Sequence, residues 1–228
     1  MTAPMRWNGF ETREALAAAL AEAVGEVLRG SVEERGTALL AVSGGSTPKR
    51  FFGALSEAHL PWTEIAVTLC DERFVPPSSD RSNEGLVRAN LLQDEAKEAS
   101  FVPLFSEAGD IGQAARRADE ALSGRAIDVA VLGMGEDGHT LSFFPDADEL
   151  EQALDPQEAR TVMAIHAQSA GEARLTLTLP PVMRAGQVFL HIEGEAKRGA
   201  FDRAMEDGAP IRRVIEKLER PIEVFWAP

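Results

Sequence analysis

Short apolar runs that alternate with helical segments constrain the fold of this chain more than any other feature of its sequence. Three of these runs, at residues 37–42 (TALLAV), 65–70 (IAVTLC) and 127–132 (IDVAVL), indicate buried strands. Strands that alternate with helices form right-handed crossovers and a mainly parallel sheet, which helices cover on both faces. The sequence therefore predicts a three-layer α/β/α, Rossmann-like domain with a mainly parallel sheet and a smaller peripheral subregion.

The remaining segments continue this alternation. Helices are expected at residues 12–28, 47–57, 111–122, 195–205 and 211–218 and from Ser82 or Asn83 to about Leu92, and strands at residues 101–105, 161–165, 188–192 and 222–226. Residues 1–228 contain no internal repeat, low-complexity segment or linker, so we expect a single domain. The acidic segment 146–160 fits either a mobile lid or a solvated helix, and the sequence leaves both open.

Charge and composition restrict the partners that this chain can bind. Its net charge is −14, and nucleic acids and anionic membranes both require a basic face, so neither is an expected partner. No apolar run approaches the roughly 18 residues of a membrane span, and no signal peptide is visible. The lone cysteine, Cys70, cannot form an internal disulfide, which fits a reducing compartment. We expect a cytoplasmic monomer that binds a small molecule.

The first of three polar clusters at strand ends reads SGGSTP. Gly44 and Gly45 let the backbone approach a ligand closely, and the helix that follows presents free N–H groups. Ser43, Ser46 and Thr47 add hydroxyl donors. This is the chemistry of a phosphate cradle, although the loop matches neither the P-loop nor GxGxxG. The alternative is an ordinary strand-to-helix turn with Thr47 as the N-cap. In so acidic a chain, an anion site also needs cations gathered locally.

The second cluster, Asp71, Glu72 and Arg73, follows the strand at 65–70. An acid pair beside an arginine can position a ligand that carries hydroxyl groups and can neutralise a developing negative charge. The alternative is a solvated strand end with a surface ion pair. Because ligands of open parallel sheets bind outside the carboxyl ends of the strands, we expect this cluster to meet the other two at one edge.

The third cluster, GMGEDGH, follows the most apolar strand. Histidine has the pKa best suited to take a proton from water near neutral pH, which makes His139 a candidate base. Asp137 could orient that imidazole or contact substrate hydroxyls. The alternative is a surface histidine. Four histidines and one cysteine are scattered without a convincing ligand spacing, so we expect neither a metal nor a cofactor.

With these clusters in this order, nearly the whole chain resembles the glucosamine-6-phosphate isomerase/6-phosphogluconolactonase family. The resemblance rests on SGGSTP (43–48), DER (71–73) followed by SDRSNEGLVRANLL (79–92), GMGEDGHTLSFFP (133–145), RLTLTLP (174–180) and GEAKR (194–198). Together these motifs are highly specific. The deaminases of the family carry an aromatic residue after the acid pair, whereas Arg73 followed by RSNEG is similar to the lactonase branch.

The resemblance implies hydrolysis of a sugar-phosphate lactone, 6-phospho-D-glucono-1,5-lactone, to 6-phosphogluconate in the oxidative pentose phosphate pathway. By the family pattern, His139 is the base that activates a water against the C1 carbonyl. Arg174 and Lys197 are implied at the phosphate, although by themselves they look like the start of a strand and part of an exposed helix. Arg73 or glycine-loop N–H groups would stabilise the oxyanion.

The sequence departs from the family pattern at one place and leaves two other functions open. The family usually reads GHTASLFP, whereas this chain has Leu141, Phe143 and Phe144, a departure that concerns local packing. An isomerase or deaminase of the same fold would use Asp71 and Glu72 as its bases. A sugar-phosphate-binding regulator would bind the ligand without chemistry.

Overall fold

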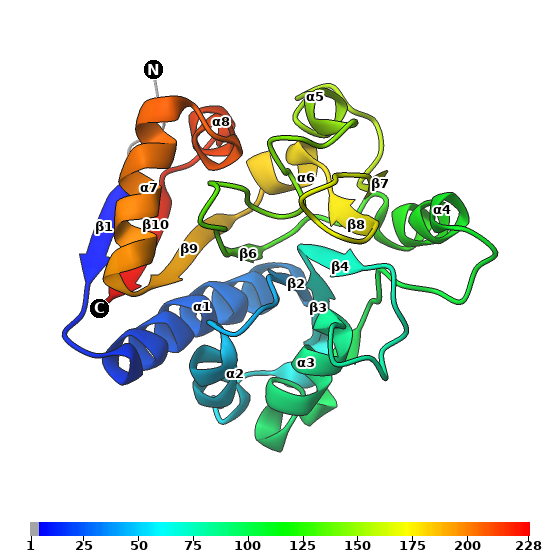
Figure 1. Ribbon diagram of the computed structural model, residues 1–228. Helices are drawn as coiled ribbons and strands as arrows, with labels where there is room; N and C mark the ends of the chain where they lie inside the picture. The colour runs from blue at the N-terminus through cyan, green and yellow to red at the C-terminus, as the bar shows by residue number, and fades with distance from the viewer. Residues whose placement is uncertain (1–4) are drawn as a thin grey trace.

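The computed structural model describes residues 5–228, which form a seven-stranded parallel sheet with helices on both sides (Figure 1). The strand order is β1-β10-β9-β6-β2-β3-β5. The bounds are β1 Arg6–Gly9, β2 Ala38–Val42, β3 Ile65–Leu69, β5 Ser100–Phe101, β6 Val129–Leu132, β9 Gln187–Glu193 and β10 Ile222–Ala227. The predicted three-layer fold is therefore confirmed. Within residues 5–228, no helix has both the length and the apolar character that crossing a membrane requires.

A second, three-stranded antiparallel sheet forms the smaller peripheral subregion. It consists of β4 (Asp71–Arg73), β8 (Arg174–Leu177) and β7 (Val162–Ile165), in the order β4-β8-β7. The chain changes sheets at Cys70, whose N–H donates to Val42 of the main sheet and whose carbonyl accepts from Leu177. The acidic cluster expected at a strand end is therefore itself a strand.

The helices enclose the main sheet, with α1 to α3 on one side and α7 and α8 on the other (Figure 1). Their bounds are α1 Arg13–Arg35, α2 Lys49–Ser56, α3 Asn83–Asn90, α4 Ile111–Leu122, α5 Leu150–Ala153, α6 Leu179–Met183, α7 Glu195–Asp207 and α8 Pro210–Lys217, with short 3₁₀ helices at Trp62–Glu64 and Asp94–Glu98. The helix expected at 12–28 continues to Arg35. Its last turns were not expected because they are mostly exposed and lack the apolar period. The helix ends at Gly36, with φ +77°.

The structure also differs from the sequence-based expectations in other elements, among them α6, which was not expected. β1 was not expected, because its four residues show no apolar alternation, and it forms by pairing with β10. β5 is shorter than the strand expected at 101–105, because only Ser100 and Phe101 pair with β3. Thr47 is not the N-cap of α2: Pro48 takes that position and makes no side-chain cap, whereas Ser82 caps α3 by accepting from the N–H of Gly85.

The central strands β6, β2 and β3 bring the three polar clusters to one edge. Val42 pairs with both Val131 and Leu69, so the carboxyl ends of these strands are level. All the residues of β2 and β6 are buried, and they form the middle of the hydrophobic core. The acidic segment 146–160 contains the one-turn helix α5, whose Glu151 forms an ion pair with Arg213 of α8 at 2.6 Å.

Candidate active site

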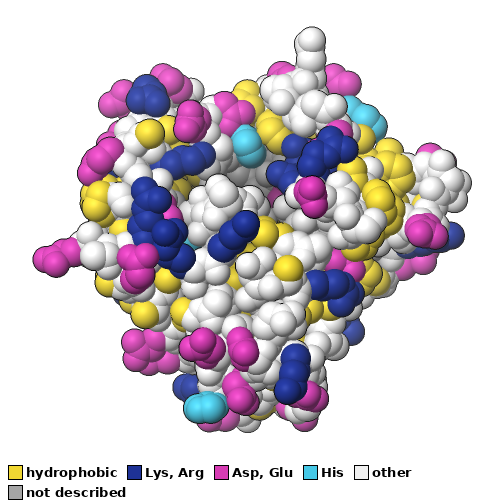
Figure 2. All heavy atoms as spheres, turned by 60° about the horizontal axis from the view of Figure 1, so that its bottom comes forward, with side chains coloured by type: hydrophobic (Ala, Val, Ile, Leu, Met, Phe, Trp, Pro, Cys, Tyr) yellow, Lys and Arg dark blue, Asp and Glu magenta, His cyan; other side chains and the backbone are white. Residues whose placement is uncertain are grey.

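A cavity of about 420 Å³ opens at the carboxyl edge of the main sheet. Every expected site residue except Asp137 lines it, namely Ser43, Gly44, Gly45, Ser46, Thr47, Asp71, Arg73, His139, Arg174 and Lys197. Figure 2 shows a hollow on one face of the molecule, with a histidine beside it and Lys and Arg side chains gathered around it. Local cations therefore surround the cavity although the chain as a whole is acidic.

The third cluster forms a histidine–carboxylate pair. His139 Nδ1 lies 2.6 Å from Asp137 Oδ1, and the same oxygen accepts from the His139 backbone N–H at 3.2 Å. The pKa of the Asp137 carboxyl is lowered: burial raises it, but the hydrogen bond and charge of His139 outweigh burial. Asp137 therefore remains ionised near neutral pH and holds Nδ1, which leaves Nε2 for proton transfer. The ring also packs against Phe144, with centroids 4.2 Å apart.

Gly135 makes room for this pair. A Cβ at this position would collide with His139 Nδ1 and Asp137 Oδ1. We expect Gly135→Ala to lower kcat at least 10-fold because the imidazole must move from its orientation, while the melting temperature changes little. Gly30→Ala is the matched control, since a Cβ there meets nothing within 4 Å. Unchanged kcat in Gly135→Ala, with both proteins folded, would contradict this account of the loop.

The SGGSTP loop is fixed against its neighbours by close contacts. The Ser43 hydroxyl accepts a hydrogen bond from the N–H of Gly133 at 3.1 Å, which joins the first cluster to the third. A Cβ on Gly44 would collide with the side chain of Asn83, and Gly45 has φ +93°, a conformation that favours glycine. Gly44 is therefore required by its close packing against Asn83, and Gly45 by its backbone conformation.

Arg73 and Arg174 face each other across β4 and β8, although like charges in that position are unfavourable. Within residues 5–228, the Nε atoms of both are buried and have no hydrogen-bond partner. Arg174 Nη2 donates to the carbonyl of Ala170 at 3.1 Å. Burial lowers the pKa of Arg174, Asp71 opposes that change and the charge of Arg73 adds to it. Two guanidinium groups at a cavity, each with a buried Nε that lacks a partner and neither in a salt bridge within residues 5–228, indicate a site for an anion.

Lys197 provides a third cation at the cavity wall. It lies in the first turn of α7, and its ammonium donates to the carbonyl of Met134 at 2.7 Å. The alternative interpretation, an exposed helical lysine, is therefore wrong, because the side chain turns back toward the loop GMGEDGH, which contains Met134.

Asp71 and Glu72 lie in two different environments, and neither residue is at a solvated strand end. Glu72 is fully buried, and its carboxylate accepts four hydrogen bonds, from the backbone N–H groups of Arg73, Asn83 and Glu84 and from the hydroxyl of Ser82. Burial raises the pKa of Glu72, and these hydrogen bonds oppose the rise. Glu72 thus anchors the N-terminus of α3 and does not line the cavity.

Asp71, by contrast, lines the cavity. Its Oδ2 accepts from the Ser142 hydroxyl at 2.7 Å, and its backbone carbonyl accepts from Asn83 Nδ2 at 2.8 Å. These contacts hold the carboxylate in place.

Among residues 5–228, no group of three or more His, Cys, Asp or Glu side chains is arranged to bind a metal ion.

Sequence reasoning missed several residues of the site, four of which matter most for its chemistry. Asn83, Phe144 and His191 line the cavity, and Ser142 positions Asp71. Asn83 was considered only as a helix cap, and Phe144 only as a packing residue. A histidine in the otherwise apolar run VFLHI was the available signal for His191.

Comparisons with known proteins show the family of this chain. The family model described as glucosamine-6-phosphate isomerases/6-phosphogluconolactonase matches residues 11–226. The 6-phosphogluconolactonase of Mesorhizobium japonicum is 56% identical, with 99% of this chain and 97% of that protein covered. The one from Rhizobium meliloti is 49% identical, with 96% and 97% covered.

A solved structure gives the same result. The crystal structure of a 6-phosphogluconolactonase from Shewanella baltica superposes with a TM-score of 0.94 at 38% identity, and the match covers 100% of both chains. The chain therefore belongs to the glucosamine-6-phosphate isomerase/6-phosphogluconolactonase family.

Proposed function

We propose that this protein hydrolyses 6-phospho-D-glucono-1,5-lactone to 6-phosphogluconate in the oxidative pentose phosphate pathway. The observation that carries the proposal is the His139–Asp137 pair, 2.6 Å apart, beside a cavity that Arg73, Arg174 and Lys197 also line. It combines a base for water with cations for a phosphate. The full-length similarity to proteins named 6-phosphogluconolactonase supports the same reaction.

His139 is the proposed general base. Its Nε2 takes a proton from a water molecule as the water oxygen attacks C1 of the lactone. Asp137 holds the other nitrogen and stabilises the imidazolium that forms. The imidazolium then gives its proton to the ring oxygen as the bond between C1 and that oxygen breaks. The product is an open-chain acid, which releases a proton near neutral pH, so hydrolysis can be followed as acid release.

The oxyanion of the tetrahedral intermediate requires a donor, and Arg73 is the proposed one. It lines the cavity, its Nε lacks a partner among residues 5–228, and its charge is only partly exposed to water. One donor of this kind contributes roughly 10²- to 10³-fold to kcat. Asp71 is proposed to accept hydrogen bonds from sugar hydroxyls, because Ser142 occupies Oδ2 and leaves Oδ1 available.

The phosphate is proposed to bind at the SGGSTP loop, with Arg174 and Lys197 as its cations. This contact lies several bonds from C1, so it would act by orientation, fixing C1 against His139 and the water. Gly45, Ser46 and Thr47 belong to the same wall and precede the N-terminus of α2, where free N–H groups favour an anion.

The rival isomerase or deaminase is disfavoured by the burial of Glu72. That reaction would need Asp71 and Glu72 as working bases, but Glu72 is fully buried and both of its oxygens are bonded at the start of α3. A regulator without chemistry is disfavoured because it has no use for an oriented His139–Asp137 pair.

The phosphate assignment is tested with Arg174→Ala. We expect KM for the phosphorylated lactone to rise about 10- to 100-fold, because hydrogen bonds to charged groups contribute roughly 1.5–3 kcal/mol, while unphosphorylated gluconolactone is affected little. Arg73→Ala is the matched comparison and should lower kcat for both lactones. Equal losses for both lactones in Arg174→Ala would remove Arg174 from the phosphate.

A further inference from the structure

A second histidine lines the cavity, and the proposed mechanism leaves it without a role. His191 lies in β9 among apolar residues, and its side chain is only 3% exposed. A buried imidazole is unfavourable unless it is hydrogen-bonded. Its Nε2 lies 3.2 Å from Glu193 Oε1, two residues further along the strand and therefore on the same face. Phe51 of α2 packs edge-on against the ring, which places this face toward α2.

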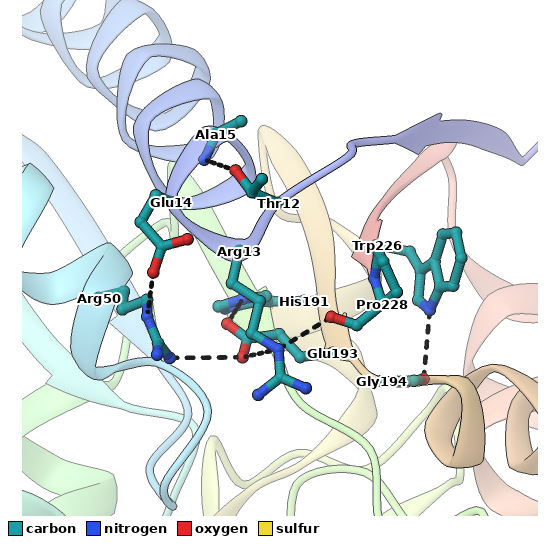
Figure 3. Close-up of polar contacts among 10 residues, drawn as sticks. All are labelled: Thr12, Arg13, Glu14, Ala15, Arg50, His191, Glu193, Gly194, Trp226 and Pro228. Atoms are coloured by element: carbon teal, nitrogen blue, oxygen red, sulfur yellow. Dashed lines mark hydrogen bonds and ion pairs between the residues drawn. The ribbon is translucent and has the colours of Figure 1, made fainter.

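Glu193 is held by two further cations, as Figure 3 shows. Its side chain is 6% exposed, and its Oε2 lies 3.5 Å from Arg13 Nε and 3.8 Å from Arg50 Nη1. Arg50 is itself bonded to Glu14 at 2.9 Å. Glu193 Oε1 therefore contacts His191, and Glu193 Oε2 contacts the two arginines. Glu193 fixes the imidazole as Asp137 fixes His139, and Nδ1 is the nitrogen of His191 that is left for a ligand.

The strand register places His191 near the start of the SGGSTP loop, where the phosphate is proposed to bind. Leu190 pairs with Leu132, so His191 is level with Gly133. The N–H of Gly133 donates to the Ser43 hydroxyl, at the start of the SGGSTP loop. Lys197 follows three residues after Gly194 in the first turn of α7 and lines the same cavity. His191 therefore lines the same cavity as the SGGSTP loop and Lys197, where we propose that the phosphate binds.

We infer that His191 is a further phosphate ligand, which Glu193 positions; this inference rests on the proposed function. In its imidazolium form, His191 donates Nε2–H to Glu193 and Nδ1–H to a phosphate oxygen. The charged groups around it are Glu193 on its own strand, Arg13 and Glu14 on α1, Arg50 on α2 and Lys197 on α7. The Glu193 carboxylate and the bound dianion are both negative and lie on opposite sides of the ring, so they favour the positively charged form in the complex.

A structural cross-link between β9, α1 and α2 is the alternative role, and it makes different predictions. Loss of a cross-link would lower the melting temperature and would affect phosphorylated and unphosphorylated ligands alike. Loss of a phosphate ligand would weaken only the phosphorylated one. Selectivity for the phosphate, rather than activity as such, therefore distinguishes the two roles.

The test compares His191→Leu with the unaltered protein. KM for the phosphorylated lactone and the Kd for 6-phosphogluconate, measured by calorimetry, should both rise about 10- to 100-fold. The kcat/KM for unphosphorylated gluconolactone should stay within about twofold. Glu193→Gln should produce a smaller change in the same direction. His166→Leu is the matched control: it removes a His–Glu pair of 2.8 Å outside the cavity and should leave the selectivity unchanged.

The outcomes separate this inference from the proposed function. If His191→Leu binds 6-phosphogluconate as tightly as the unaltered protein, or weakens both lactones equally, His191 is not a phosphate ligand. If the unaltered protein hydrolyses no lactone, the proposed function fails, and the Kd comparison still decides the role of His191. Should His191→Leu melt at a lower temperature, His191→Gln provides the same comparison, because its amide can still reach Glu193 from the Nε2 position but offers no donor at the Nδ1 position; unchanged selectivity there would overturn the inference.

Discussion

We expect His139→Ala to lower kcat by about 10²- to 10⁴-fold while KM for the phosphorylated lactone changes little, because general-base assistance acts in the transition state and not in binding. His139 Nδ1 is held by Asp137, and the side chain lines the cavity, so removing the ring removes the proposed proton acceptor. Steady-state rates corrected for spontaneous hydrolysis provide the measurement.

Two variants make this prediction specific. Asp137→Asn should cause a smaller loss of kcat, because the imidazole remains but loses the charge that stabilises its protonated form. His59→Ala is the control, since that side chain is 91% exposed. Near-normal turnover of His139→Ala would remove His139 from the role of base.

The second large effect is expected on stability rather than on catalysis. Glu72→Ala should lower the free energy of unfolding by about 3 kcal/mol or more, because it leaves three backbone N–H groups and the Ser82 hydroxyl without their acceptor. For a chain of this size that corresponds to a melting temperature lower by roughly 6–12 °C. Urea unfolding followed by circular dichroism measures it.

Glu22→Ala is the control for that experiment. It removes an exposed carboxylate from α1, where surface substitutions usually change stability by no more than about 0.5 kcal/mol. If Glu72→Ala were as stable as Glu22→Ala but inactive, Glu72 would act in catalysis, as the rival isomerase mechanism requires.

The main sheet could be predicted from the sequence because its signal is local. The runs at 37–42, 65–70 and 127–132 became β2, β3 and β6, and the helix at 111–122 has the expected bounds. The small sheet could not be fully predicted, because Asp71–Arg73 is polar and becomes a strand only by pairing with Arg174–Leu177, far along the chain.

The same distinction between local signals and long-range contacts applies to the site. Glycines, hydroxyls and the His–Asp pair stand close together in sequence, so the loops that carry them were recognisable. The face-to-face pairing of Arg73 and Arg174 depends on the register of two distant strands. The surroundings of His191 depend on Arg13 and Arg50, which reach Glu193 from two separate helices. Contacts of this kind are set by tertiary packing and leave no local pattern.

The central claim is tested most directly by the turnover of freshly generated 6-phosphogluconolactone, followed as acid release above the spontaneous rate, with unphosphorylated gluconolactone and glucosamine-6-phosphate in parallel. We predict fast hydrolysis of the phosphorylated lactone, much slower hydrolysis of the unphosphorylated one and no ammonia from glucosamine-6-phosphate. Acid release at the spontaneous rate, or release of ammonia, would contradict the proposal.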